Sequence, residues 1–277
     1  MIHLVVAVRN RINFTKNFLK SIENQSIDQF KIIIVDDGST DGTYEYLKSL
    51  DNVQVIRGNG NLFWAESTNI AVKQAIDDGA THILTMNDDT TLDLSFMEQM
   101  SKVSKIKPAA LIGCLAVDAE STKPIYAVIK MDWKQPKEVM ALDDLNDKDD
   151  GLIEINQYCG RGLLIPVEVF NKIGFYDSKN FPQTIADIDF CNRAFKNGYS
   201  IFCNRKAILY TYPNESNAVK LRENKSISNF YKHLFTLHGA GNLIRFWKYA
   251  IKNCPRRFLV KYIIYGTSAR IINYWLK

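Results

Sequence analysis

Short, mostly apolar runs alternate along the first part of the chain with segments of helical spacing. The apolar runs are Leu4–Val8, Lys31–Val35, Val53–Ile56 and Ile83–Met86. Runs without apolar–polar alternation are typical of strands covered on both faces. Between the last two runs, a helix from Trp64 to Asp78 is expected to end at the glycine Gly79. The alternation predicts an α/β fold with a mostly parallel sheet flanked by helices.

The second half of the chain has a less regular pattern. Strands are predicted at Leu111–Val117, Ile125–Met131 and Leu163–Ile165, and helices at Val167–Ile173 and from Ala186 to Gly198. The acidic, apolar-poor segment Asp143–Gly151 predicts a loop. Residues 1–220 are therefore expected to form the main domain, and residues 221–277 a helical C-terminal extension.

Composition places the chain among ordinary globular proteins. It has 277 residues, of which 46% are hydrophobic and 23% charged, enough for one large domain with an appendage. Its five cysteines are scattered and form no CxxC motif, which favours a reducing, cytoplasmic location over a disulfide framework or zinc site. The opening MIHLVVAVRN is soon interrupted by Arg9 and Arg11, so it predicts a strand and not a signal peptide.

Charge is distributed unevenly along the chain. The last acidic residue is Glu223, and residues 224–277 contain ten Lys or Arg with many aromatic side chains. Only eight uncharged residues separate Lys261 from Arg270, far fewer than the ~20 of a membrane span. The acidic front part disfavours nucleic acid as a partner. Two interpretations of this tail remain open: an anionic membrane surface, or packing on the main domain or in a homo-oligomer.

Acidic residues follow two of the predicted strands. Asn87-Asp88-Asp89 comes directly after one buried run, and Asp36-Asp37 after another. Ligands of open α/β sheets bind at the carboxyl ends of strands, and clustered oxygen ligands suit Mg²⁺ or Mn²⁺ holding phosphate. Arg161, between two glycines, could reach an anion. A solvated turn is the alternative for one acidic strand end, but two ends on one sheet favour a site.

Several sequence motifs, in this order, resemble a known family. They are VVAVRNR (5–11), IIIVDDGSTDGT (32–43), GNGNLFWAESTNIAVKQA (58–75), ILTMNDDT (83–90), CGRGLLIPVEVFNKIGFYD (159–177) and FPQTIADIDFCNRAFKNGY (181–199). Together they resemble the family 2 inverting glycosyltransferases of the GT-A fold, over roughly residues 2–212. The chain is most similar to the bacterial, rhamnosyltransferase-like subset that builds surface polysaccharides.

The resemblance implies roles for particular residues. Those matched to nucleotide or donor-sugar contacts are Val8, Arg9, Asn10, Asp36, Asp37, Trp64, Asn69, Asn87, Asp88 and Arg161. Asn87, Asp88 and Asp89 match the metal motif, with Asp89 in its metal-ligating position. Asp187, six residues before Arg193, matches the catalytic base, and Asp189 takes the second acidic position. Ala7-Val8 and Asn87 depart from the family's usual Pro-Thr and first Asp.

The implied activity is transfer of a sugar from a UDP- or dTDP-linked donor to a saccharide acceptor, lipid-linked in this subset. A metal ion, Mn²⁺ or Mg²⁺, neutralises the departing diphosphate, and one carboxylate takes the acceptor's proton, which gives inversion. Such an enzyme would be cytoplasmic, with the tail compatible with peripheral association at the inner face of the membrane.

Other classes of protein share some of these features. A pyrophosphorylase needs a glycine-rich loop that VAVRNRIN lacks, and a dehydrogenase needs a GxGxxG that Gly58 and Gly60 do not complete. A non-catalytic protein that binds a nucleotide sugar stays open because Asn87 replaces an acid.

The resemblance also makes His238 a candidate late metal ligand, with an ordinary helix or surface histidine as the alternative.

Overall fold

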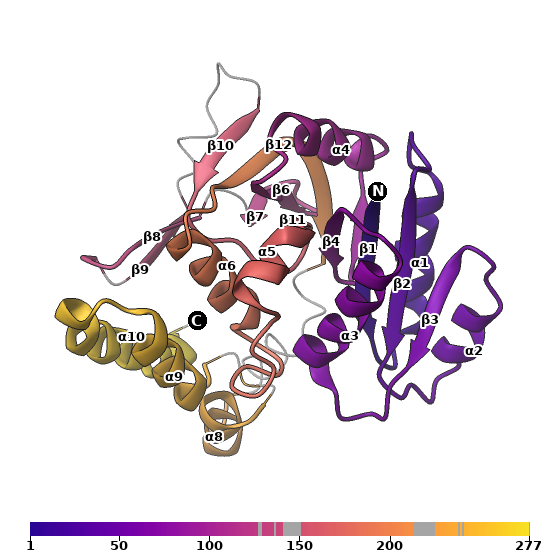
Figure 1. Cartoon of the computed structure of the whole chain (residues 1–277). Helices are drawn as coiled ribbons and strands as arrows, with labels where there is room; N and C mark the ends of the chain where they lie inside the picture. Colours follow the sequence, from indigo (N-terminus) through magenta and orange to yellow (C-terminus); the bar gives the residue numbers. More distant parts are fainter. Residues whose placement is uncertain are drawn as a thin grey trace.

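The computed structural model describes residues 1–126, 129–135, 137–140, 151–212, 225–237, 239 and 241–276. Most of the predicted loop Asp143–Gly151, and His238, lie outside the described residues. In the described part of the chain, a single ten-stranded sheet forms the centre of the molecule, in the order β10-β12-β6-β11-β4-β1-β2-β3 with β5 and β7 beside it (Figure 1).

The first four strands form a parallel sheet, as the apolar runs predict. They are β1 (Ile2–Val8), β2 (Phe30–Asp36), β3 (Val53–Arg57) and β4 (His82–Met86). The helices that connect them are α1 (Ile12–Glu23), α2 (Thr43–Lys48) and α3 (Phe63–Asp77). Strand β1 lies between β2 and β4, with Val8 paired to Asp36 and Val6 to Met86. The carboxyl ends of β2 and β4 therefore flank the end of β1.

The remaining strands extend the sheet in mixed directions. They are β5 (Thr90–Leu92), β6 (Leu111–Asp118), β7 (Pro124–Tyr126), β10 (Leu152–Ile155), β11 (Leu163–Pro166) and β12 (Ile201–Thr211). Strand β11 runs antiparallel between β4 and β6, whereas β6 and β12 are parallel. The helices are α4 (Phe96–Ile106), α5 (Val167–Ile173) and α6 (Ala186–Lys196). The α/β fold with a central sheet flanked by helices is confirmed, but the sheet is mixed: β1 to β4 pair in parallel, whereas β5, β7, β10 and β11 pair antiparallel with their neighbours.

One strand prediction is wrong. The segment predicted as the single strand Ile125–Met131 contributes to two strands in different sheets. Its start belongs to β7, which pairs with β6, and its end to β8 (Ile129–Asp132), which pairs with β9 (Lys137–Met140) in a separate hairpin. The side chain of Asn156, the residue after β10, bonds both the N–H and the carbonyl oxygen of Met131, and so ties the hairpin to the end of β10.

The described residues of the C-terminal extension form three helices, α8 (Ile227–Phe235), α9 (Leu243–Asn253) and α10 (Arg256–Leu276). Figure 1 shows them grouped beside α6, on the opposite side of the molecule from α2 and β3. Lys196 of α6 donates a hydrogen bond to the carbonyl oxygen of Asn253 at 2.8 Å, and Asn192 bonds the hydroxyl of Tyr249. Within the described residues, we find no helix with the length and apolar content that a bilayer span requires.

Candidate active site

Asp88 follows β4 and is buried, with only 2% of its surface exposed. Its Oδ2 accepts a hydrogen bond from the Thr15 hydroxyl at 3.0 Å, and its Oδ1 lies 3.3 Å from Arg11 Nη1. Burial raises the pKa of Asp88 to about 6, with the neighbouring Asp89 carboxylate acting in the same direction and Arg11 opposing it. A second positive charge at this strand end would therefore stabilise the ionised pair.

Asp89 has one oxygen paired and one unpaired. Its Oδ2 accepts a hydrogen bond from Arg11 Nη2 at 3.2 Å. Its Oδ1 is buried and has no hydrogen-bond partner among the described residues, the Nη2 of Arg161 being 4.0 Å away. A buried carboxylate oxygen without a partner is costly unless a ligand completes it. The Asp89 carboxylate thus fits the divalent cation that the resemblance implies.

The neighbours of Asp89 decide what kind of cation site this is. Asn87 Oδ1 accepts a hydrogen bond from Trp64 Nε1 at 3.1 Å, and Asp88 faces Arg11 and Thr15. No group of three His, Cys, Asp or Glu that could enclose a metal ion occurs within the described part of the chain. Such a site suits Mg²⁺ or Mn²⁺ held by one or two carboxylates together with substrate phosphates, and not an all-protein cage.

Asp187 lies in the first turn of α6. The backbone is strained at the residue that precedes this helix. Ile185 precedes the helix with φ 75°, a left-handed conformation that is unusual for a β-branched residue. The carboxylate accepts hydrogen bonds from the backbone N–H groups of Gly160 and Ile188, both at 2.9 Å. Loss of hydration among the surrounding protein atoms raises the pKa of Asp187 above its ordinary value, although these hydrogen bonds act in the opposite direction. The residue is nevertheless partly exposed.

A tryptophan connects the base candidate to the metal motif. Gly160, whose N–H binds Asp187, faces the Trp64 ring so closely that a Cβ there would lie 2.4 Å from it. The same indole binds Asn87 and contacts the Tyr176 ring edge-on, with centroids 5.2 Å apart. Asn87, Trp64, Gly160 and Asp187 therefore form one continuous group, although Asp187 is far from the metal motif in the sequence.

The ends of β1 and β2 form a second polar group, which shapes the loop before α3. Asp37 is buried and accepts hydrogen bonds from the N–H groups of Gly60, Leu62 and Phe63 at 2.7, 3.0 and 3.1 Å. These bonds hold the loop from which Trp64 enters α3. Both oxygens of Asp37 are thus engaged with the protein itself.

Asp36 differs from Asp37 in having an unengaged oxygen. It is fully buried, its Oδ1 accepts a hydrogen bond from Ser39 N at 2.8 Å, and Arg57 Nη1 lies 3.7 Å from that oxygen. Its Oδ2 has no hydrogen-bond partner in the described part of the chain. An unsatisfied acceptor at a strand's carboxyl end is the feature expected where a ligand donor group binds.

The three residues at the end of β1 have different surroundings. Val8 is buried and contributes its carbonyl oxygen to the N–H of Asp37 at 2.9 Å. Arg9 is half-exposed and lies 4.0 Å from Asp37. Asn10 adopts φ 51°, and its Oδ1 accepts a hydrogen bond from Thr40 N at 2.7 Å. Arg9 therefore faces the Asp37 loop and Asn10 the turn at Thr40, both at the surface, whereas Val8 supports the strand end.

Two predicted site residues are engaged in holding the fold. Asn69 is buried and bonds both backbone groups of Tyr176, at 2.9 and 3.0 Å. Asp189 is fully buried; its Oδ2 lies 3.0 Å from both Arg193 Nε and Lys252 Nζ, and its Oδ1 accepts from Asn253 at 2.9 Å. Asp187 and Asp189 share one helix turn, yet Asp187 faces Gly160 and Asp189 faces α9.

We predict that Asp189→Ala lowers the free energy of unfolding by about 3 kcal/mol, because Arg193 and Lys252 would lose their shared buried counter-ion. Asp177 is the matched control, since it also pairs with Lys252, at 2.7 Å, but its side chain is 20% exposed. Asp177→Ala should cost less than about 1 kcal/mol. Urea unfolding followed by circular dichroism measures the free energy of unfolding of both variants. Equal decreases would contradict the inference that Asp189 is the buried counter-ion of Arg193 and Lys252.

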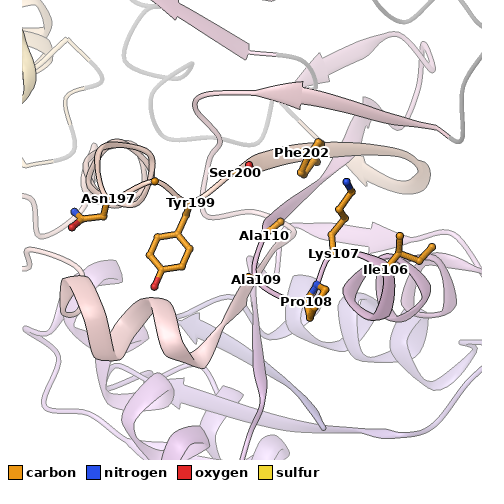
Figure 2. Close-up of a pocket in the computed structure, with 10 residues that line it drawn as sticks. Ile106, Lys107, Pro108, Ala109, Ala110, Asn197, Tyr199, Ser200 and Phe202 are labelled. Carbon is orange, nitrogen blue, oxygen red and sulfur yellow. The ribbon is translucent and has the colours of Figure 1, made fainter.

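A pocket of about 440 Å³ lies elsewhere, at the amino ends of β6 and β12. Figure 2 shows Asn197 and Tyr199 on one side and Phe202, Lys107 and Ile106 on the other, with Ala109 and Ala110 between them. The ammonium of Lys107 stands 5.1 Å from the centre of the Phe202 ring. No acidic residue is present among the residues that line it. It is therefore separate from the polar groups at the carboxyl ends of the strands.

The central sheet flanked by helices matches the GT-A fold of the solved structures reported below. The chain belongs to glycosyl transferase family 2, whose model matches residues 3–174. No curated protein matches it by sequence. The family named by the resemblance is thus confirmed.

Solved structures support the same fold. S. aureus TarS 1–349 superposes with a TM-score of 0.60 at 14% identity, covering 99% of this chain and 88% of that one. The complex of TarS 1–349 with UDP superposes with a TM-score of 0.61, also at 14% identity, covering 99% of this chain and 88% of that one. GalNAc-T7 with UDP, GalNAc and Mn²⁺ gives 0.63 at 12% identity, covering 97% of this chain and 57% of that one.

Arg11 was not among the residues predicted for the site. It contacts both acids of the metal motif, at 3.3 Å from Asp88 and 3.2 Å from Asp89. Its place directly after an apolar strand, beside Arg9, was the available signal. The sequence could not show which of these two arginines points to β4 and which to the Asp37 loop.

Proposed function

We propose that this chain is a metal-dependent, inverting glycosyltransferase that moves a sugar from a nucleotide-diphosphate sugar to a saccharide acceptor. One observation carries the proposal most directly. Through Trp64 and Gly160, the Asp187 carboxylate stands in the same group of contacts as Asn87 of the metal motif. A base for the acceptor and a site for the donor diphosphate are thereby adjacent, which single displacement requires.

The donor nucleoside is assigned to the ends of β1 and β2. Asp36 offers a buried acceptor oxygen there, and Arg9 and Asn10 lie at the adjoining surface. We propose a uridine or thymidine diphosphate sugar as the donor. The solved structures of TarS 1–349 and GalNAc-T7 contain UDP, which supports a nucleotide donor of this kind.

The donor diphosphate is assigned to the end of β4. A divalent ion held there by Asp89, with Asn87 and Asp88 beside it, would neutralise charge on the leaving phosphates. Arg11 and Arg161 stand 3.2 and 4.0 Å from Asp89 and can hold the same phosphate oxygens. Asp88, buried between Arg11 and Thr15, orients Arg11 toward this region.

Asp187 is assigned as the general base. A sugar hydroxyl has a pKa far above 7, so its attack needs a carboxylate that takes the proton as the new bond forms. The raised pKa of Asp187 makes it a stronger base than an ordinary aspartate, and its backbone hydrogen bonds fix its orientation. One base and no protein nucleophile give inversion at the sugar carbon. We assign Asp189 a positioning role behind it.

We further propose a lipid-linked saccharide as the acceptor, in the synthesis of a bacterial surface polysaccharide at the cytoplasmic face of the membrane. The support is the rhamnosyltransferase-like motif pattern together with the basic C-terminal helices beside α6. The competing function is a GT-A protein that binds a nucleotide sugar without transfer, favoured by the amide at Asn87. Formation of a glycosylated product separates the two.

A thermal melt tests the donor assignment. In the presence of Mn²⁺, UDP or dTDP at 100 times its dissociation constant should add about 2.7 kcal/mol to stability, a shift of several degrees. Chelating the metal with EDTA should reduce the shift, and adenosine diphosphate serves as the control ligand. A larger shift with adenosine diphosphate, or none with either pyrimidine nucleotide, would contradict the donor proposal.

A further inference from the structure

The long helix α10 is apolar on both its sides. Its inner side is buried at Tyr262, Gly266 and Tyr274. Gly266 approaches α9 so closely that a Cβ there would meet the Phe246 ring at 2.1 Å. Its other side nevertheless exposes Val260 and Ile264, at 70% and 62%. Large apolar side chains exposed on a helix that is already buried along another side require an explanation.

Exposed apolar side chains of α9 and α10 meet in one surface, here termed the outer face. It is formed by Trp247 and Ile251 of α9 and by Val260, Ile264, Ile271 and Trp275 of α10. Trp247 Nε1 donates a hydrogen bond to Thr267 at 3.0 Å, and Thr267 lies between Ile264 and Ile271 on the helix. The two stripes are therefore adjacent. Continuity of this kind distinguishes a binding surface from scattered exposed residues.

Cations lie on the two helices that form the outer face. Arg256, Arg257 and Lys248 are exposed on the same two helices, and Lys261 reaches the carbonyl oxygen of Lys134 at 3.0 Å. The stretch of residues 225–276 contains no Asp or Glu. Tryptophan and aliphatic side chains flanked by Lys and Arg are the composition of a surface that enters the headgroup region of a membrane.

From these observations we infer that the outer face binds the surface of a bilayer containing anionic phospholipids. The apolar side chains enter the headgroup–acyl boundary, and the flanking cations pair with lipid phosphates. A second copy of the chain fits this face less well. A two-fold contact would bring two sets of these cations together with no acidic residue from residues 225–276 to pair with them.

The inner side of α9 contacts α6, the helix that carries the proposed base Asp187. Lys252 and Asn253 at the end of α9 bind Asp189, two residues from Asp187. Arg245 of α9 donates to Thr184 at 3.2 Å, just before α6. Docking the outer face would therefore place the proposed base near the membrane, where a lipid-linked acceptor is presented. This last consequence rests on the proposed function, whereas the membrane binding itself does not.

Vesicle flotation of the full chain tests the inference. Vesicles of phosphatidylglycerol and phosphatidylcholine should carry the protein at low salt, and vesicles of phosphatidylcholine alone should carry far less. The double variant Val260→Ser, Ile264→Ser, which removes side chains exposed at 70% and 62%, should weaken binding to the anionic vesicles at least ~tenfold. The matched control is Leu94→Ser, Ile106→Ser, which removes side chains exposed at 65% and 59% from the main domain.

The control variant should float like the unchanged chain, and all three proteins should melt at similar temperatures and keep the UDP-induced shift. Failure of the unchanged chain to bind anionic vesicles at low salt would overturn the inference. Equal loss of binding in both variants would also overturn it. So would self-association in light scattering that only the outer-face variant abolishes. Vesicle binding without any nucleotide effect would instead refute the proposed function alone.

Discussion

Asp187→Asn is expected to lower kcat by at least ~10² while leaving folding and donor binding intact, because the amide cannot accept the acceptor's proton. The substitution is nearly isosteric, and the amide oxygen can still accept a hydrogen bond from Gly160 N, which is 2.9 Å from the carboxylate. Nucleotide-dependent melting shifts measured beside the steady-state rates distinguish lost chemistry from lost binding. Turnover at the unchanged rate would remove Asp187 as the base.

The rate of the same reaction is expected to fall at low pH. The protein around Asp187 raises the pKa of its carboxyl group above the ordinary 3.8. A base acts only when ionised, so kcat/KM should fall as pH decreases through this raised pKa, and should level off above it. The residual activity of Asp187→Asn should lack that acid limb. An acid limb that persists in the variant would assign the titration to another group.

Asp89→Ala is expected to abolish metal-dependent turnover. Its Oδ1 is the buried oxygen without a hydrogen-bond partner at the end of β4, and Arg11 would lose a carboxylate at 3.2 Å. Loss of the ligand would leave charge on the departing diphosphate without its metal. Rates measured across a Mn²⁺ titration, beside the same titration of the unchanged chain, give the effect.

Asn87→Asp is the matched substitution at the same strand end. An aspartate restores the first acid of the motif and keeps an oxygen that can accept the hydrogen bond from Trp64 Nε1, now 3.1 Å from Asn87. Turnover should be kept or raised, at a lower metal requirement. EDTA should stop the reaction of the unchanged chain. Full activity of Asp89→Ala, or of the unchanged chain in EDTA, would exclude this metal site.

The parallel half of the sheet could be predicted because its strands have a simple signature. The runs that end at Val8, Val35 and Met86 are buried on both faces, so they are uniformly apolar, and the polar residues after them mark the strand ends. The acidic groups at Asp36 and Asp88 follow from the same rule. Both acidic groups lie at the same edge of the sheet because β2 and β4 run parallel to β1, and strand–helix alternation already implies this parallel pairing.

The antiparallel strands and the partners of the site residues could not be predicted in this way. Strand β11 is also uniformly apolar, so its direction depends on where the chain returns and not on composition. Asp189 resembles Asp187 in the sequence, and its separate role appears only when Lys252, 63 residues later, approaches it. The basic extension was correctly expected to be helical, but its contacts with α6 are tertiary and have no signal in the sequence.

The stereochemistry of the product tests the central claim most directly. The chain would be incubated with an α-linked UDP- or dTDP-sugar, Mn²⁺ and a panel of saccharide acceptors, and the new linkage would be followed by NMR from its first appearance. The account predicts a β-linked product together with one nucleoside diphosphate per transfer, because Asp187 activates the acceptor for a single displacement. An α-linked product, or nucleoside diphosphate released without any glycosylated acceptor, would contradict it.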